Sequence, residues 1–443
     1  MRGENFYRGL LRILNEKFAG LEFLANAWEK TSGLTRFSKS RIHQNVYEEE
    51  ITLTVLVTKD NKIAVGTTND LSTSSLERLR ENLEEILKNT EELGYKFRLP
   101  SPRMDYPYEK VAESVKKATS EDRAKIFDGI VKLAEGTDVY GYIETSLDEF
   151  CVMSSNGLYL YTCVSSSSFN TVVMCEDGSG YTSGSSWDLK ELDWEEKVKK
   201  AVETAKRSRK PVDIDPGKYT VILSPEAVSE IVQYFTHFAA NGYYHETKTS
   251  PSIRFLGKKI GPDDLNIVDD PNYPGQIPLV FDMCGMKRES FPIVEKGVFK
   301  NLMYAYGTAL KFSKKPTPHT ITLDNLDVPY PFNLVIEPGE TSLEDLLRSV
   351  DRGLWITRFH YVNLVDPMNA VFTGMTRDGT FLIEKGEVTK PVKNMRFNIG
   401  FFDMTNNISG ISKECSAVAT EYTPIIAPYI KVEDFNFTSK SDH

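Results

Sequence analysis

The segment 211–217, PVDIDPG, divides the chain into two halves. Two prolines and a glycine interrupt any regular helix or strand there. The apolar run YTVIL follows at once, at residues 219–223, and is typical of a buried strand. Because 443 residues are too many for one compact core, two domains are expected. We therefore predict an N-terminal domain at residues 1–210 and a C-terminal domain at residues 211–443.

The N-terminal half mixes helical and strand patterns. Charged residues interrupt the apolar residues of segment 1–30, which predicts an amphipathic helix. Helical periodicity also marks residues 74–93 and 120–136, while residues 139–182 alternate as antiparallel strands do. The following segment, 179–188, is SGYTSGSSWD and has no hydrophobic period. It is predicted to be a flexible surface loop, or else a segment that becomes ordered around a bound peptide.

The C-terminal half is predicted to be mostly β. A helix begins at Ser224-Pro225, where a serine cap precedes a first-turn proline. Two segments about ninety residues apart each contain a short strand, Glu-Lys-Gly and another strand, with the glycines at Gly297 and Gly386. Each predicts a hairpin. The expected fold class is α+β, with a mixed α/β N-terminal domain followed by a larger, mostly antiparallel β-rich domain with a few helices.

Charge and composition exclude several classes of protein. The net charge is −10, whereas nucleic-acid binding draws most of its affinity from Lys and Arg. No run of apolar residues is long enough for a membrane helix, and the charged start does not fit a secretory signal. The five cysteines show no metal or redox spacing, which favours buried thiols in a reducing compartment. These features predict a cytoplasmic protein that binds neither membrane nor nucleic acid.

The segment most suggestive of chemistry is NGYYHETKTSPS at residues 241–252. His245 followed by Glu246 is half of a zinc-peptidase signature, in which two imidazoles hold the metal and the carboxylate activates a bound water. The ordinary pattern needs a second His four residues after the first, and Thr249 stands there. On residue types alone the His-Glu pair is a weak signal. Tyr243 and Tyr244 beside it either line a substrate groove or pack internally.

Several longer segments, taken together, are far more specific than this motif. They include SKSRIHQNVYEEEITLTVLV near the start, FLGKKIGPDDLNIVDDPNYPG, FDMCGMKRESFPIVEKGVFKNLMYAY, TRFHYVNLVDP, FTGMTRDGTFLIEKGEVTKPVKNMRF and the final ECSAVATEYTPIIAPYIKVEDFNF. In sequence and in order, from about residue 34 to residue 438, the chain resembles the TldD/PmbA family, formerly called modulators of DNA gyrase. That resemblance implies a protein related to metallopeptidases.

The resemblance also implies a ligand set. TldD-type members are similar to zinc peptidases that carry His-Glu, three residues and a second His, with a C-terminal Cys as a further ligand. By position these are His245, Glu246 as the catalytic carboxylate, and Cys415, while the second His falls on Ser250. A neutral hydroxyl is a poor zinc ligand, and Pro251 is expected to end a helix there. The degenerate motif is closer to the TldE/PmbA type, whose members lack the full zinc motif.

Three functions follow from this reading. The first is a TldE/PmbA-like, non-catalytic subunit that pairs with a TldD-like peptidase, which holds the zinc, and encloses unfolded peptide. The second is an active homodimeric metallopeptidase with an altered zinc site that uses His245, Glu246 and Cys415. A rearranged site in which His237, His319 or His360 joins His245 and Cys415 is a further alternative. The third is a regulatory binder of DNA gyrase or nucleic acid, against which the acidic charge counts. Whether the chain is itself an enzyme stays open at this point.

Overall fold

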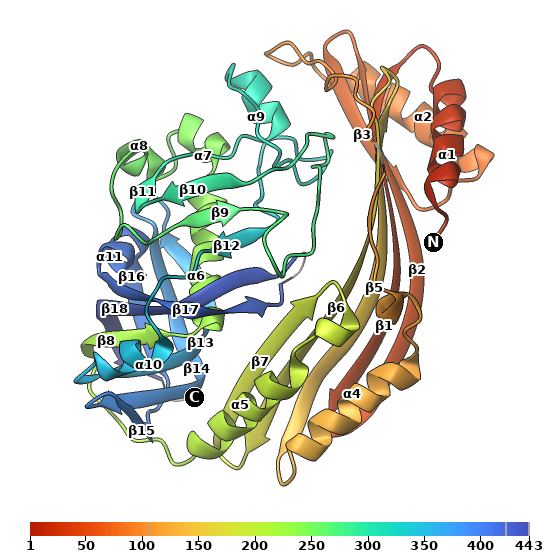
Figure 1. Ribbon diagram of the computed structural model, residues 1–443. Coiled ribbons are helices and arrows are strands. Elements are labelled where there is room, and N and C mark those ends of the chain that lie inside the picture. The colour runs from red at the N-terminus through yellow and green to blue at the C-terminus, as the bar shows by residue number, and fades with distance from the viewer. Residues whose placement is uncertain (106, 421–422, 442–443) are drawn as a thin grey trace.

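The computed structural model describes residues 1–105, 107–420 and 423–441. Figure 1 shows a long, curved sheet from the N-terminal half facing a β-rich body from the C-terminal half. Antiparallel strand pairs dominate both halves, and helices flank each sheet. This architecture confirms the predicted α+β fold class. Within the described residues, no helix is both long enough and apolar enough to cross a membrane.

The first sheet has the strand order β3-β2-β1-β5-β6-β4, and β7 pairs with β6. Its strands are β1 (Glu22–Ser38), β2 (Arg41–Lys59), β3 (Lys62–Thr68), β4 (Tyr108–Lys110), β5 (Asp138–Ser154), β6 (Tyr159–Cys175) and β7 (Gly178–Ser186). The helices of this half are α1 (Glu4–Lys17), α2 (Thr73–Asn89), α3 (Glu113–Lys116), α4 (Ser120–Leu133), the 3₁₀ turn η1 (Leu189–Glu191) and α5 (Trp194–Arg207).

Helices cover the outer face of this sheet at both ends (Figure 1). α1 and α2 pack over one end, and α4 and α5 pack over the other. The predicted helix at residues 1–30 is correct only as far as Lys17. The chain then turns at Gly20, whose φ is 88°, and enters β1. Residues 23–27 of this strand are buried on both faces of the sheet. This explains why the charged residues of segment 1–30 all lie outside residues 23–27.

The prediction of a flexible loop at residues 179–188 is wrong. Most of this segment belongs to β7, which pairs with β6 along its length and packs against α5. The small residues have a packing role. A Cβ atom at Gly180 would lie 2.0 Å from the carbonyl oxygen of Ala201, so only glycine lets α5 approach the strand this closely. The lack of a hydrophobic period reflects this close helix–strand contact.

The second sheet has the strand order β11-β10-β9-β12-β18-β16-β14-β13-β8, with β15 on β14 and β17 on β18. Its strands are β8 (Gly217–Leu223), β9 (Ile267–Asp269), β10 (Phe291–Glu295), β11 (Val298–Phe299), β12 (Leu334–Ile336), β13 (Arg352–Asp366), β14 (Val371–Glu384), β15 (Glu387–Pro391), β16 (Met395–Gly400), β17 (Ile408–Val418) and β18 (Ile425–Lys440). The helices are α6 (Pro225–Phe238), α7 (Gly242–Glu246), α8 (Ser252–Phe255), α9 (Tyr306–Lys311), α10 (Leu343–Arg348) and α11 (Phe401–Asn406).

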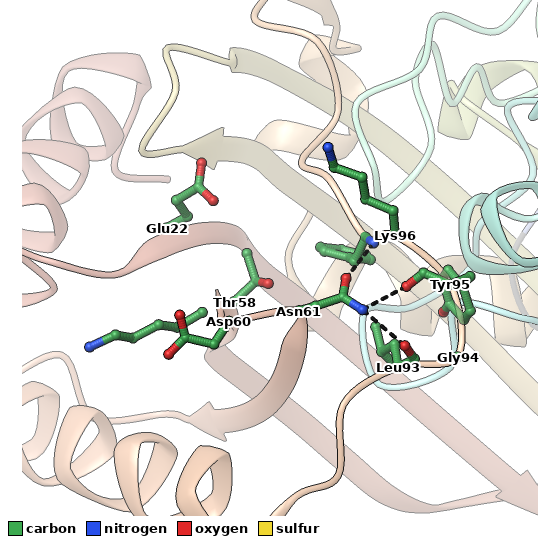
Figure 2. Close-up of a pocket in the computed structure, with 10 residues that line it drawn as sticks. Glu22, Thr58, Asp60, Asn61, Leu93, Gly94, Tyr95 and Lys96 are labelled. Atoms are coloured by element: carbon green, nitrogen blue, oxygen red, sulfur yellow. Dashed lines mark hydrogen bonds between the residues drawn. The ribbon is translucent and has the colours of Figure 1, made fainter.

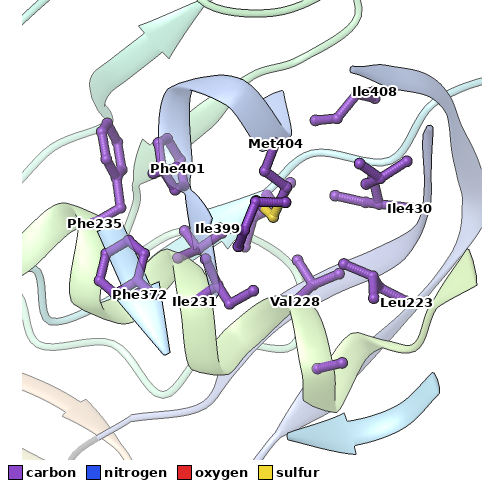
Figure 3. Close-up of a cluster of buried hydrophobic side chains, with 14 of the residues drawn as sticks. Leu223, Val228, Ile231, Phe235, Phe372, Ile399, Phe401, Met404, Ile408 and Ile430 are labelled. Carbon is purple, nitrogen blue, oxygen red and sulfur yellow. The ribbon is translucent and has the colours of Figure 1, made fainter. Parts of the chain in front are cut away.

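An additional pairing of β18 with β8 closes β8, β13, β14, β16 and β18 into a ring. The apolar side of α6 packs against these strands and against α11, as Figure 3 shows. The rings of Phe235 and Phe401 stack there with centroids 3.7 Å apart. Ser224 caps α6 and Pro225 occupies its first turn, as predicted. This large core positions α6, which α7 follows in the chain, and α11, which β17 follows.

The contacts between the two halves of the described chain include an apolar one and a hydrogen-bonded one. At one, side chains of β5 and β6 pack on the segment 280–326, and Phe150 stacks on Phe281 at 5.5 Å. At the other, Lys197 of α5 donates to the carbonyl oxygens of Ser183, 2.7 Å away, and Ala417, 2.8 Å away. Because the two sheets share no strand among the described residues, we propose the domain boundary between residues 210 and 211, at the start of the predicted linker.

Candidate functional site

The predicted His-Glu pair lies on α7, a helix of only five residues. Asn241 caps this helix, and its side-chain oxygen accepts from the backbone N–H groups of Tyr243 and Tyr244. The helix rests against the segment leading to α9, because Gly242 donates its N–H to the carbonyl oxygen of Met303 at 2.8 Å. A Cβ atom on Gly242 would lie 2.5 Å from the Tyr304 ring. The glycine therefore allows Tyr304 to reach the site.

A chain of hydroxyl groups orients His245. Ser250 Oγ donates to the carbonyl oxygen of Ala239 at 3.3 Å, and Ser252 Oγ donates to Ser250 Oγ at 2.9 Å. Ser252 has then used its proton, so it accepts from Nδ1 of His245, 3.0 Å away. The lone pair of the neutral ring consequently lies on Nε2. Burial, assisted by the charge on Lys314, lowers the pKa of His245, so the imidazole is neutral near pH 7.

Glu246 is engaged by a phenol and an ammonium group. Its Oε1 atom accepts from the hydroxyl of Tyr304 at 2.7 Å and lies 2.9 Å from Nζ of Lys314. Burial acts to raise the pKa of Glu246, but these two partners outweigh it and hold that pKa below its usual value. Burial and the carboxylate raise the pKa of Tyr304. A carboxylate so stabilised is a weaker base than an unpaired one.

The residue at the second-His position is buried and hydrogen-bonded within the protein. Ser250 is 1% exposed and takes part in the hydroxyl chain. α7 ends at Glu246, before Pro251, and Lys248 has a φ of 61°, so residues 245–250 do not form one helix. Pro251 instead precedes the short helix α8. The geometry of a helical zinc motif is therefore absent from this segment of the described chain.

Cys415 lies on β17, opposite Pro428 of β18; the residue is exposed and is not in a disulfide. Partial burial of its thiol raises the pKa of Cys415, which disfavours the thiolate that binds metals. The described His, Cys, Asp and Glu side chains form no group of three or more that could hold a metal. With a serine hydroxyl in place of the second imidazole, the residues of this site do not fit the zinc ion that the family resemblance implies.

The other three candidate histidines have separate surroundings. His237 packs against the rings of Phe238 and Tyr330, and burial lowers its pKa. His319 is buried, with Nε2 2.9 Å from Oδ2 of Asp269. His360 is on β13 beside a register irregularity. Each is tied to its own element, and in the described residues none of the three joins His245 in a group of metal ligands.

The two tyrosines beside the motif form an aromatic surface with a basic neighbour. Tyr244 stacks on Phe238 with ring centroids 5.9 Å apart, and Tyr243 meets Tyr244 edge-on. The ammonium of Lys311 lies 5.7 Å from the centre of the Tyr243 ring. Both tyrosines keep part of their surface in solvent. A role for them in holding peptide remains a proposal.

A surface hollow of about 580 Å³ lies elsewhere, in the N-terminal half. Figure 2 shows it between the β2–β3 turn and residues 93–97. Asn61 closes its base, because its amide donates to the carbonyl oxygens of Leu93 and Tyr95 and its Oδ1 accepts from Phe97 N–H. None of the predicted site residues lines this hollow.

Sequence reasoning did not identify the partners of the His-Glu pair. Ser252, Tyr304 and Lys314 are brought to it by α8 and by the segments flanking α9. A serine, a tyrosine and a lysine at these separations match no sequence motif, so the sequence alone provides no signal for them. The close packing of Gly242 on Tyr304 is what lets the phenol reach Glu246.

Comparison with known proteins identifies the family. The chain matches the model of the PmbA/TldA metallopeptidase central domain over residues 101–209 and that of the C-terminal domain over residues 216–439. A metalloprotease of Methanothermobacter thermautotrophicus is 23% identical over 51% of this chain and 50% of its own length. A metalloprotease of Synechocystis sp. is 22% identical over 76% of each. The chain thus spans about half the length of the first relative.

The fold is similar to that of a solved protein. The crystal structure of TldE from Thermococcus kodakarensis matches with a TM-score of 0.89 and 21% identity, over 98% of this chain and 99% of that one. At this identity the likeness establishes the fold alone. The C-terminal family model, however, covers half of the sequence by itself. The chain therefore belongs to the TldD/PmbA family of metallopeptidase-like proteins.

Proposed function

We propose that this chain is a non-catalytic, TldE-type subunit that assembles with a TldD-like zinc metallopeptidase acting on unfolded peptides. The observation that carries the proposal is the state of the His-Glu pair. Ser250, which stands where the second imidazole belongs, is buried in a chain of hydroxyl groups. Glu246, the carboxylate that would activate water, is held by Lys314 and Tyr304.

Two further observations support this assignment. Lys314 places a positive charge within 3 Å of Glu246, where a zinc ion would be repelled. The similarity of the fold to a protein named TldE covers nearly the whole chain. In this proposal the partner holds the zinc, and His245, Tyr243 and Tyr244 contribute a polar and aromatic wall next to the bound peptide. The cytoplasm is the proposed location.

The alternative is an active homodimer that uses His245, Glu246 and Cys415. It requires Lys314 to leave Glu246 and a third ligand to reach the site, and within the described residues no such group is assembled. The proposed subunit role is therefore preferred.

The test uses the purified chain with and without a TldD-like protein from the same source. We expect the two to co-elute on size exclusion, and only the mixture to cleave unfolded casein in an EDTA-sensitive reaction. His245→Ala in this chain should leave that activity largely intact, whereas loss of the metal-ligand histidine in the partner should abolish it. EDTA-sensitive cleavage by this chain alone, abolished by Glu246→Gln, would overturn the proposal.

A further inference from the structure

One edge of the N-terminal sheet is open. β1 pairs with the whole of β2, but β3 pairs with β2 only from Leu53 onward. Among the described residues, no strand pairs with residues 41–52 on the side away from β1. A register shift marks the start of this stretch, so the regular open edge is the segment 44–52. At about 3.3 Å per residue, nine residues extend over roughly 30 Å. We name this segment the β2 edge.

The β2 edge is exposed and acidic. Nearly all of its residues up to Glu50 face solvent, and Tyr47 is 66% exposed. Glu48, Glu49 and Glu50 are consecutive, and none of them forms a salt bridge with another described residue. Directly opposed residues of an antiparallel pair point to the same face. Glu48 lies opposite Ser32 and Glu50 opposite Lys30, so these two carboxylates share one face of the sheet.

Further acidic groups lie on that same face. Lys30 is opposite Asp148 in β5, and its ammonium is already paired with Glu144 at 2.8 Å. Asp148 accepts from the indole N–H of Trp28 at 3.0 Å, and this indole is 46% exposed. Lys30 is therefore paired with β5 and lies only within electrostatic reach of Glu48, and neither Glu48 nor Glu50 forms a salt bridge within the described residues.

We infer that the β2 edge binds an extended polypeptide with Lys or Arg at alternate positions, which adds to the sheet as a further strand. The backbone of an open edge offers N–H and C=O groups to such a segment. Side chains two residues apart in the added strand would face Glu48 and Glu50 together. The exposed Trp28 on the same face offers a ring to a cationic side chain.

A second copy of this chain is a poorer occupant. Two β2 edges in antiparallel register around Tyr47 and Glu48 would bring six glutamates together, and like charges directly opposite destabilise a sheet. The acidic row thus prevents edge-to-edge pairing while it leaves the edge open to a strand of opposite charge. The inference rests on the proposed function only in taking an unfolded peptide as the ligand. Binding itself needs this chain alone.

The experiment measures binding to the isolated full-length chain, so that its failure is distinguishable from a failure to assemble with a peptidase. The probe is a fluorescent heptapeptide of alternating Lys and Thr, followed by anisotropy at low salt. Two further peptides carry N-methyl groups on the Lys or on the Thr residues. We expect one of these two isomers to bind as the parent does and the other to lose binding at least tenfold, because an added strand bonds through one of its edges only.

Variants and hydrogen exchange locate the site. Glu48→Lys with Glu50→Lys should weaken binding at least tenfold. The control, Glu81→Lys with Glu85→Lys on exposed positions of α2, changes the net charge equally and should weaken binding less than twofold. Bound peptide should slow amide exchange within residues 44–52. The inference is overturned if both N-methyl isomers bind equally, if both double variants weaken binding alike, or if the unliganded chain is a dimer that only the Glu48/Glu50 variant dissociates.

Discussion

The ammonium group of Lys314 lies 2.9 Å from Oε1 of Glu246, the carboxylate that a zinc peptidase of this family type would use as its base. The same oxygen accepts a hydrogen bond from Tyr304. Two donors therefore occupy the group that, in a catalytic member, must be free to accept a proton from water. The cation thus opposes both metal binding and proton abstraction at this position.

Removing the cation should change the neighbouring imidazole. The Lys314 charge acts to lower the pKa of His245, so Lys314→Met should raise that pKa. A titration of the His245 ring protons by NMR measures the shift. Lys315→Met removes an exposed lysine next in the sequence and should leave the titration unchanged. A His245 pKa that falls or stays constant in Lys314→Met would contradict the electrostatic coupling.

The tautomer of His245 should depend on Ser252. Ser252→Ala removes the acceptor of the Nδ1 proton, so the proton should move to Nε2, the site preferred by an unconstrained imidazole. Nitrogen-15 chemical shifts of the ring distinguish the two forms. Thr249→Ala is the matched control, because within the described chain Thr249 bonds to Thr247 and the carbonyl oxygen of Tyr244 and not to the hydroxyl chain. Equal tautomer shifts in both variants would exclude the hydroxyl chain as the cause.

The buried ion pair between Arg288 and Asp269 should be essential for stability. Both side chains are 1% exposed, and Asp269 also contacts His319 and the backbone N–H of Asn333. Arg288→Met leaves a buried carboxylate without its cation, which should cost about 3–5 kcal/mol in the free energy of unfolding. Lys287→Met, which removes an exposed lysine paired with Glu289, should cost less than about 1 kcal/mol. Urea unfolding measures the free energy of unfolding of both variants. Similar losses of stability in the two would disprove the stabilising role of the buried ion pair.

Asp282 should give the protein an unusual dependence of stability on pH. Burial raises the pKa of Asp282 to about 6, above the ordinary value of an aspartate. Between about pH 4 and pH 6 the folded chain then holds a proton that the unfolded chain has lost. This group's contribution to stability consequently falls as pH rises through that window, by roughly 1–3 kcal/mol. Asp282→Asn should remove that fall.

The measurement is the free energy of unfolding of wild type and Asp282→Asn at a series of pH values. Asn keeps one of the two carboxylate oxygens that accept from the N–H groups of Cys284, Met286 and Thr320, and replaces the other with a donor, so the variant should be less stable throughout. The informative quantity is the difference between the two proteins, which should become smaller from pH 4 to pH 6. A difference that stays constant or grows would show that Asp282 titrates normally.

Lys197 should couple the two halves of the chain. Burial lowers the pKa of its ammonium group, which donates to one carbonyl in each half. Lys197→Met leaves the two carbonyl groups without this donor and should lower the free energy of unfolding by about 1–3 kcal/mol. Lys200→Met on the exposed side of α5 is the control, with an expected change within about 0.5 kcal/mol. Equal changes in the free energy of unfolding of the two variants would mean that the Lys197 contact between the halves does not stabilise the fold.

Short-range features of the fold were predictable from local sequence. The two Glu-Lys-Gly segments are the β10–β11 and β14–β15 hairpins, with positive φ at Lys296, Gly297, Lys385 and Gly386. Such turns depend on the conformational freedom of a few residues, so their sequence is enough to identify them. The Lys59–Lys62 turn between β2 and β3 is a further example.

Features set by packing were not predictable in the same way. The glycines and serines of β7 resemble a loop, and only the approach of α5 over Gly180 explains why they form a strand. Likewise, Thr341 and Glu344 have capping-box spacing, yet the cap of α10 is Ser342 with Asp345. For the candidate site, the sequence predicted His245, Glu246 and Ser250, but their partners Tyr304 and Lys314 come from a segment about sixty residues away.

The zinc content of the purified, tag-free chain tests the central claim most directly. Elemental analysis should be made on wild type, His245→Ala and Cys415→Ala after purification with zinc in the medium. The account predicts far less than one zinc per chain in all three proteins. Close to one zinc per wild-type chain, lost in both variants, would contradict it and establish an altered metallopeptidase site on this chain itself.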